Sequence, residues 1–257
     1  MLPSSLQLGS SFDPAGQRLF LATSSALYTI HVATNTVTQV PLPAGASFGF
    51  LEYDPVTGLV YTAEQVGPSS RILIGVDPVS GAVVPGPPLP SSFLTGSGFD
   101  PATRRLFLLT SSSLVTTNVT TGVTTQVPAP ANAFTLLDYD PVSGQVYVAR
   151  DVAPGNRVAT AVDPVTGAPV DGPALPSFHD GTGIDPAGRR LFLQDATGVV
   201  SINVVTGVST HVTVPGGTFG FLEFASATPD VPVLGGGTLL LFGVLLAAAG
   251  LLRLGSA

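Results

Sequence analysis

Two alternating motifs recur along most of this sequence, and the recurrence limits the fold more than any other feature. One motif, FDPAGQRLFLATSSAL, begins at Phe12 and returns in similar form at Phe99 and Ile184. The other, YDPVTGLVYTAE, begins at Tyr53 and returns as YDPVSGQVYVAR at Tyr139. The aspartates of successive motifs lie 41, 46, 40 and 45 residues apart, at Asp13, Asp54, Asp100, Asp140 and Asp185. Repeats of this length indicate one supersecondary unit that stacks on copies of itself.

Each unit contains four short strand signals. In the unit that follows Ser47 they are FGFLEYD, GLVYTAE, RILIGVD and GAVVPGP, each bounded by Gly, Pro, Asp or Ser. Segments such as DPVTG and NVTTG place Asp or Asn at the start of a turn and Gly where a positive φ is needed. No apolar period of 3.6 residues runs long enough for a helix before residue 230. The sequence therefore predicts an all-β protein over this region.

Four strands in every repeat of 40 to 46 residues are typical of β-propeller blades. The repeats resemble bacterial surface propellers of the YVTN and NHL type, and they lack the Gly-His and Trp-Asp dipeptides of WD repeats. A β-solenoid is the main alternative, although its repeats are usually shorter. We expect a propeller over residues 1–225, with five complete blades at 5–47, 48–92, 93–131, 132–176 and 177–217.

The two ends of the repeat region have complementary phases. Thr218–Phe224 (TFGFLEF) copies Ser47–Tyr53 (SFGFLEY), which opens the second blade. The N-terminal LPSSLQLGSSFDP matches LPSSFLTGSGFDP from Leu89, which follows a fourth strand. Because a closed ring removes exposed strand edges, we expect a six-bladed ring whose last blade is shared by both termini. Its other strands and an export signal would precede Met1; the alternative is a five-bladed protein with a spare strand.

The last part of the sequence differs sharply in composition from the repeats. Residues 226–232 form a short link, and the run from Val233 to Leu252 contains twenty residues without a charge. At about 1.5 Å per residue such a helix spans about 30 Å, the thickness of a bilayer core. The sequence therefore predicts one transmembrane helix within 233–257. Asp230 before it and Arg253 after it favour a cytoplasmic C-terminus and a propeller outside the cytoplasm.

The tail also resembles the IPTL-CTERM and PEP-CTERM sorting signals of bacterial envelope proteins. Val231-Pro232-Val233-Leu234 lies where that class has Ile-Pro-Thr-Leu, followed by the apolar run and a basic residue. The resemblance implies a bacterial cell envelope and a sorting protease as a partner. Gly235 and Gly236, and a single arginine in place of a basic cluster, depart from the family pattern at the positions that bear on cleavage.

Composition removes several function classes. Nine basic residues, all Arg, face sixteen acidic ones, and the net charge of −7 argues against a nucleic-acid partner. The absence of Cys excludes disulfides, thiolate nucleophiles and Cys-based zinc sites. His31, His179 and His211 form no HExxH or HxH pair, and no GxSxG elbow, P-loop or dinucleotide fingerprint occurs. A Ser–His–Asp arrangement around His179 and Asp180 stays open.

One set of acidic residues is a candidate ligand site. Two positions before the turn aspartate, alternate blades carry Glu52, Asp138 and Glu223, and the blades between them carry Ser11, Gly98 and Gly183. First strands line the centre of a propeller, so the three carboxylates would lie near threefold symmetry, an oxygen-rich array of the kind that calcium prefers. Their mutual repulsion needs compensation. The alternative is pairing with arginines of neighbouring blades: Arg18, Arg104, Arg105, Arg189 or Arg190.

These features together predict a non-enzymatic, membrane-anchored, envelope-exposed propeller. It would act as a binding or scaffold module for a protein or glycan ligand, without a cofactor unless calcium binds at the centre. Seven of the sixteen acidic residues precede Pro in turns, so much of the acidity is interpreted as turn chemistry and not as a ligand patch. The alternatives are a lactonase-type propeller hydrolase with a channel-bound cation and a structural matrix protein.

Overall fold

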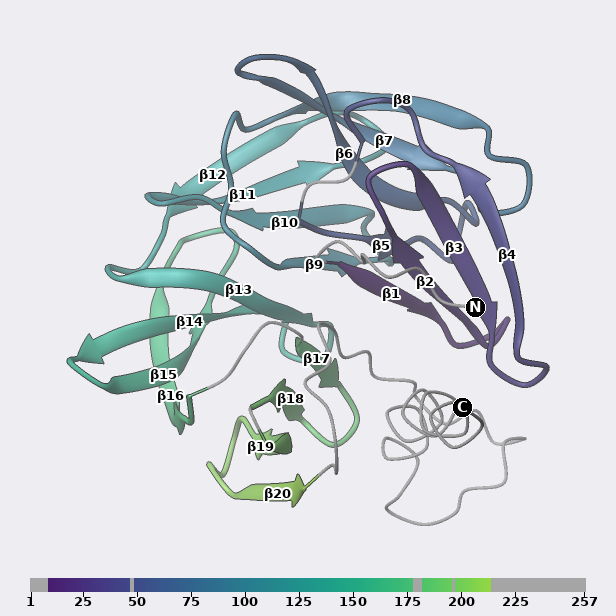
Figure 1. The fold of residues 1–257 in the computed structure, drawn as a ribbon. Coiled ribbons are helices and arrows are strands. Elements are labelled where there is room, and N and C mark those ends of the chain that lie inside the picture. Colours follow the sequence, from purple (N-terminus) through teal and green to yellow (C-terminus); the bar gives the residue numbers. More distant parts are fainter. Residues whose placement is uncertain (1–8, 47–48, 178–181, 196, 214–257) are drawn as a thin grey trace.

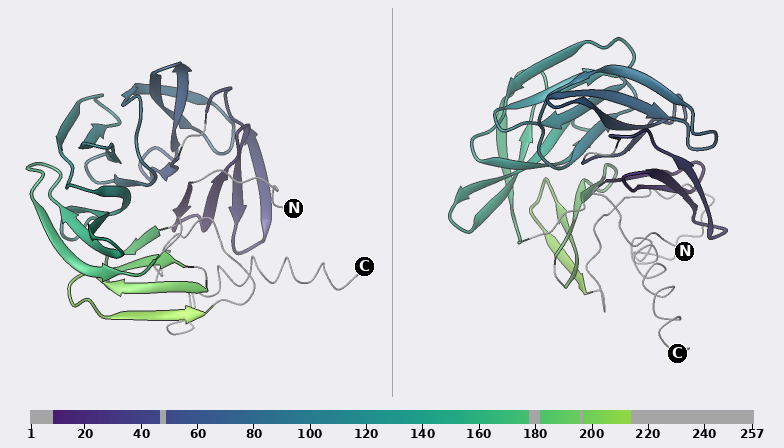
Figure 2. Two further views of the ribbon diagram at one scale, coloured as in Figure 1. Left: turned by 60° about the vertical axis from the view of Figure 1, so that its left-hand side comes forward. Right: turned by 45° about the horizontal axis from the view of Figure 1, so that its top comes forward.

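The computed structural model of the chain describes residues 9–46, 49–177, 182–195 and 197–213. Twenty strands form five antiparallel sheets, and each sheet contains four consecutive strands in simple meander order. The sheets surround a common centre as the blades of a propeller (Figures 1 and 2). The predicted all-β class and the four-stranded blade are therefore confirmed, and the solenoid alternative is wrong.

The five blades, numbered in chain order, fall within the limits expected from the repeats. Blade 1 contains β1 (Ser10–Asp13), β2 (Arg18–Ala22), β3 (Ala26–His31) and β4 (Thr36–Pro41). Blade 2 contains β5 (Glu52–Tyr53), β6 (Val60–Gly67), β7 (Ser70–Val76) and β8 (Val83–Leu89). Blade 3 contains β9 (Ser97–Asp100), β10 (Arg105–Leu109), β11 (Ser113–Asn118) and β12 (Thr124–Pro128). Blade 4 contains β13 (Ala133–Asp140), β14 (Gln145–Ala153), β15 (Asn156–Val162) and β16 (Pro169–Leu175). Blade 5 contains β17 (Thr182–Asp185), β18 (Arg190–Gln194), β19 (Gly198–Asn203) and β20 (Ser209–Thr213).

The recurring Asp-Pro pairs form the turns that the sequence predicts. In blade 1, Asp13 Oδ1 accepts hydrogen bonds from the backbone N–H groups of Ala15 at 3.1 Å and Gly16 at 3.0 Å. An aspartate that binds the backbone two and three residues ahead closes the turn by itself. The same arrangement recurs at Asp77, whose Oδ1 accepts from Val79 at 2.8 Å. Local chemistry thus explains why this dipeptide recurs at strand connections, and Asn118 and Asn203 open two further turns in the same way.

In blades 2 to 5, the turn between third and fourth strands also contacts the preceding blade. Gly81 in blade 2 has a φ of 73°, and a Cβ there would lie 3.2 Å from Cβ of Val40 in blade 1. Gly167 in blade 4 has a φ of 74° and would bring a Cβ to 3.0 Å from Val127 in blade 3. Only glycine combines this left-handed conformation with so close an approach. These turns therefore fit neighbouring blades together at their outer strands.

The first strands lie side by side and run parallel around the ring. The Leu136 N–H donates to the Thr95 carbonyl at 3.1 Å, and three residues further along both strands Gly98 lies against Tyr139. Because the two positions advance together, β9 and β13 point in the same direction. Strands alternate within each meander, so the turns between strands 1 and 2 and between strands 3 and 4 lie at one end of every blade. We call this end the Asp-turn face, and the end with the hairpins between strands 2 and 3 the hairpin face.

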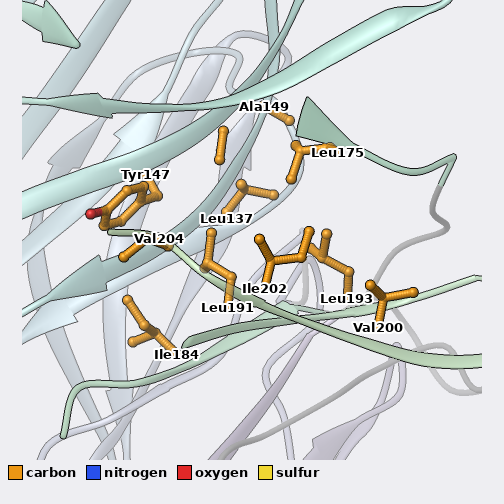
Figure 3. Packing of buried hydrophobic residues seen from close by; sticks show 11 residues of the cluster. Leu137, Tyr147, Ala149, Leu175, Ile184, Leu191, Leu193, Val200, Ile202 and Val204 are labelled. Atoms are coloured by element: carbon orange, nitrogen blue, oxygen red, sulfur yellow. The ribbon is translucent and has the colours of Figure 1, made fainter. Parts of the chain in front are cut away.

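The hydrophobic core lies between blades and not within them. Figure 3 shows the layer between blades 4 and 5, where Leu137 and Tyr147 of blade 4 pack against Leu191, Leu193 and Ile202 of blade 5. A central strand is covered on both sides, so its sequence does not alternate between apolar and polar residues. In β10, Leu106 packs toward blade 2 and Phe107 toward blade 4, and both are fully buried. Each such side chain contributes roughly 1.5–3 kcal/mol to stability.

Several predictions fall outside the described residues. They concern the strand copy at 218–224, the link at 226–232 and the apolar run at 233–252. Within the described residues there is no helix long and apolar enough to cross a membrane.

Candidate functional site at the centre of the ring

The structure brings together two of the three predicted carboxylates. Glu52 begins β5 of blade 2 and Asp138 lies in β13 of blade 4, and both are partly buried where the first strands meet. They are close enough for the charge of Asp138 to raise the pKa of Glu52. The third residue of the set, Glu223, lies outside the described residues.

The direction of Glu52 follows from the packing of its neighbours. Leu51 and Tyr53 belong to the apolar layer between blades 1 and 2, so alternation along the strand turns Glu52 toward blade 3. There Ser97 donates its hydroxyl hydrogen to Glu52 Oε1 at 2.5 Å. Burial and, to a lesser extent, the Asp138 charge raise the pKa of Glu52 from 4.5 to about 8, against the opposing effect of the Ser97 hydrogen bond. The carboxyl group therefore holds a proton well into the neutral range.

Asp138 makes the equivalent connection from blade 4 to blade 5. Its Oδ2 accepts a hydrogen bond from the backbone N–H of Ile184 at 2.9 Å, and its Oδ1 accepts from Tyr139 at 2.7 Å. Burial, with a smaller contribution from the Asp140 charge, raises the pKa of Asp138 from 3.8 to about 7, although both N–H donors favour the charged form. Each of the two carboxyl groups thus joins its own blade to the next one.

Blade 1 uses a hydroxyl for the same purpose. Ser11 Oγ, at the position equivalent to Gly98 and Gly183, accepts from the Tyr53 N–H of blade 2 at 2.7 Å. Gly98 instead leaves no room for a side chain, because a Cβ would lie 2.8 Å from the Tyr139 nitrogen. The small residues predicted from the repeats therefore let neighbouring first strands approach closely.

The arginines do not pair with Glu52 or Asp138 in the described part of the chain, so this alternative is wrong for those two residues. They bind the turn aspartates on the Asp-turn face instead. Two pairs lie within one blade, at 2.7 and 3.1 Å: Arg18–Asp13 and Arg105–Asp100. Two pairs join neighbouring blades, at 2.7 and 2.9 Å: Arg104–Asp54 and Arg189–Asp140. The fifth arginine of the predicted set, Arg190, donates to the Ser201 hydroxyl at 2.9 Å.

The cross-blade ion pairs are the feature that sequence reasoning missed. The side chains of Asp54 and Asp140 are completely buried, while Arg104 and Arg189 keep about a fifth to a quarter of their side chains exposed, at 19% and 26%. Both arginines have a left-handed backbone, with φ of 60° and 53°. The sequence signal for these ion pairs is the Arg-Arg dipeptide at the start of the second strand in blades 3 and 5. Blade 1 has Gln17-Arg18 at the same place.

Histidine contributes one small polar cluster away from the centre. His211 Nε2 in β20 lies 3.2 Å from Asp195 Oδ2 and 3.1 Å from Thr197 Oγ1. A hydrolytic triad needs the carboxylate on one ring nitrogen and the hydroxyl on the other, whereas both groups here contact the same nitrogen. His31 ends β3, and His179 and Asp180 lie outside the described residues.

The centre can hold a proton, and with one more ligand it could hold a cation. The carboxyl oxygens of Glu52 and Asp138 and the Ser97 hydroxyl are hard donors of the type that calcium accepts. Among the described residues, however, no group of three or more His, Asp or Glu side chains is placed to hold a metal ion. Glu52 and Asp138 alone therefore do not complete a metal site.

Comparison with known proteins shows the fold and leaves the activity open. No protein-family model and no curated protein matches the sequence. A structural genomics protein of unknown function from Bacteroides thetaiotaomicron superposes with a TM-score of 0.61 at 17% identity, covering 82% of this chain and 59% of that one. A putative TolB from Agrobacterium tumefaciens gives 0.58 at 13% identity, covering 82% and 81%. An oligogalacturonate lyase in complex with manganese gives 0.55 at 13% identity, covering 80% and 64%. This chain thus spans less than two thirds of the first and third of these structures. At such identities the likeness shows a β-propeller fold.

Proposed function

We propose that this protein is a membrane-anchored, envelope-exposed β-propeller that acts as a non-catalytic binding or scaffold module. The observation that carries the proposal is that polar side chains at the ring centre form hydrogen bonds between neighbouring blades. Glu52, Asp138 and Ser11 each bind the first strand of the next blade. Residues committed to joining blades make a stable support, and a stable support suits the presentation of a binding surface.

The anchor is the apolar run at 233–252, and its test is fractionation. The full chain should sediment with membranes and resist extraction by salt. Replacing both Leu241 and Leu246 with Arg should release it, because each central arginine costs roughly 2.5–3.5 kcal/mol on insertion. The matched control replaces the same two leucines with Ala and should stay with the membrane.

Two results of that experiment decide the proposal. A wild-type chain that fractionates as soluble without loss of its tail contradicts the anchor. A chain whose C-terminus is removed, as mass spectrometry would show, instead supports processing by a sorting protease. A protein or glycan ligand would then be sought with the intact ring.

A lactonase-type hydrolase with a bound cation is the second candidate. It is favoured by one observation, the proximity of Glu52 and Asp138 at the ring centre. A cation held there would stabilise the folded state by mass action. Calcium should then raise the melting temperature of the wild type and leave a Glu52→Gln, Asp138→Asn variant unchanged. An equal response of both proteins removes this candidate.

A further inference from the structure

Five of the six most exposed valines among the described residues share one repeated position. Among the described residues, five valines lie two residues after the Asp or Asn that opens a turn, with exposed fractions of 67%, 79%, 63%, 73% and 67%: Val56, Val79, Val142, Val165 and Val205. The equivalent place holds Thr120 after Asn118 in blade 3, and it holds alanine in the turns between first and second strands of blades 1, 3 and 5: Ala15, Ala102 and Ala187. The turn uses only the backbone N–H of this residue, so its geometry does not require valine. An apolar contact outside the chain would account for the preference.

All five valines belong to the Asp-turn face. They lie in turns between strands 1 and 2 or between strands 3 and 4, which share one end of each blade. Four of the seven turn aspartates on this face are paired with an arginine: Asp13, Asp54, Asp100 and Asp140. Asp77 and Asp163 bind backbone N–H groups, which lower the pKa of both carboxyl groups. The face therefore presents apolar valines at the turn tips and carboxylates of which four are neutralised by arginine.

The direction of the chain indicates what covers this face. First strands run toward the Asp-turn face, as β5 and β13 do when they reach the turns at Asp54 and Asp140. The sequence repeat predicts that residues 218–224, outside the described residues, make a further first strand. Only the eight residues 225–232 would then separate its end from the apolar run at 233–252. Fully extended, eight residues span at most about 26–29 Å.

We propose that the Asp-turn face rests on the surface of a zwitterionic lipid bilayer, with the five turn valines in contact with the boundary between headgroups and acyl chains. The inference rests on the proposed membrane anchor. Apolar side chains on a surface gain free energy at that boundary. The net charge of −7 and the absence of lysine disfavour anionic lipid and favour a neutral one.

The sequence offers a clean optical test because it contains no tryptophan. A single reporter is placed on the Asp-turn face by Val79→Trp or Val165→Trp in the full chain. The matched control is Val66→Trp on the hairpin face, where the valine is 54% exposed. Each variant is reconstituted into phosphatidylcholine vesicles with and without brominated phosphatidylcholine, after thermal melts show wild-type folding.

The Val79→Trp and Val165→Trp proteins should lose most of their emission in brominated vesicles, and Val66→Trp should lose none. Flotation with the vesicles reports the anchor independently of the reporter. Proteins that float but stay unquenched, with the reporter open to acrylamide, overturn the docking proposal and leave the anchor intact. A reporter shielded from both bromolipid and acrylamide also overturns it, because protein, such as a second copy, then covers the face. Failure to float contradicts the anchor and the docking together.

Discussion

The ion pair between Arg104 and Asp54 should be one of the strongest single links between two blades. Arg104 reaches from the turn before β10 to a carboxylate in blade 2 that has no exposed surface, at 2.7 Å. The carboxylate also accepts from the Val56 N–H at 2.9 Å and the Thr57 hydroxyl at 2.6 Å. In an Arg104→Gln variant these two hydrogen bonds remain, but the buried negative charge loses its counter-ion. Gln fits the left-handed backbone, because Gln17 occupies the equivalent position of blade 1 with a φ of 49°.

The expected loss follows from burial. Removing one partner of a buried pair costs about 3–5 kcal/mol, because an uncompensated charge stays in the interior. The Arg104 side chain is 19% exposed, so water offsets part of the loss and we expect about 3 kcal/mol. An Asp54→Asn, Arg104→Gln double variant should lose less than the sum of the single variants, because it leaves no buried charge.

The measurement is urea unfolding of the full chain in mild detergent at neutral pH. The matched control is Arg157→Gln, which breaks an exposed pair at 3.3 Å with Asp151 and a ring contact with Phe134. That control should cost about 1 kcal/mol or less. The reasoning is refuted if Arg104→Gln costs no more than Arg157→Gln, or if the double variant shows no coupling.

Two further predictions concern the ring centre. The folded state holds the Glu52 proton more tightly than the unfolded state, so stability should fall as pH rises from 4.5 through about 8. Melting temperatures between pH 5 and pH 9 should show this fall, and Glu52→Gln should reduce it. If the variant shows the same pH dependence as the wild type, the raised pKa of Glu52 is contradicted. Gly98→Ala should lower the free energy of unfolding by roughly 1–3 kcal/mol, because its Cβ would meet the Tyr139 backbone at 2.8 Å. The control in the same unfolding assay is Gly67→Ala, whose Cβ would meet only Ser70 at 3.6 Å. Equal losses of stability in the two variants would show that blade spacing is not the cause.

Local features of the sequence predicted the blades well. Asp13 and Asp77 close their own turns, so the recurrence of Asp-Pro marked strand ends without knowledge of the fold. The approximate position of the central carboxylates also followed, because Glu52 and Asp138 share one offset from the turn. Their hydrogen-bond partners did not follow. Ser97 lies 45 residues from Glu52, and Ile184 lies 46 residues from Asp138.

The arginine pairs show most clearly where sequence alone stops. Arg104 and Arg105 are adjacent, yet one binds Asp54 in the preceding blade and the other binds Asp100 in its own. The φ of 60° at Arg104 precedes the regular strand at Arg105, so the two side chains start from different backbone directions. The sequence by itself determined the repeat, the turns and the strands, because short-range hydrogen bonds and apolar runs specify them. Only the tertiary structure decided which charge meets which and how far the pKa of Glu52 rises, because burial and cross-blade distances exist only when the blades are packed together.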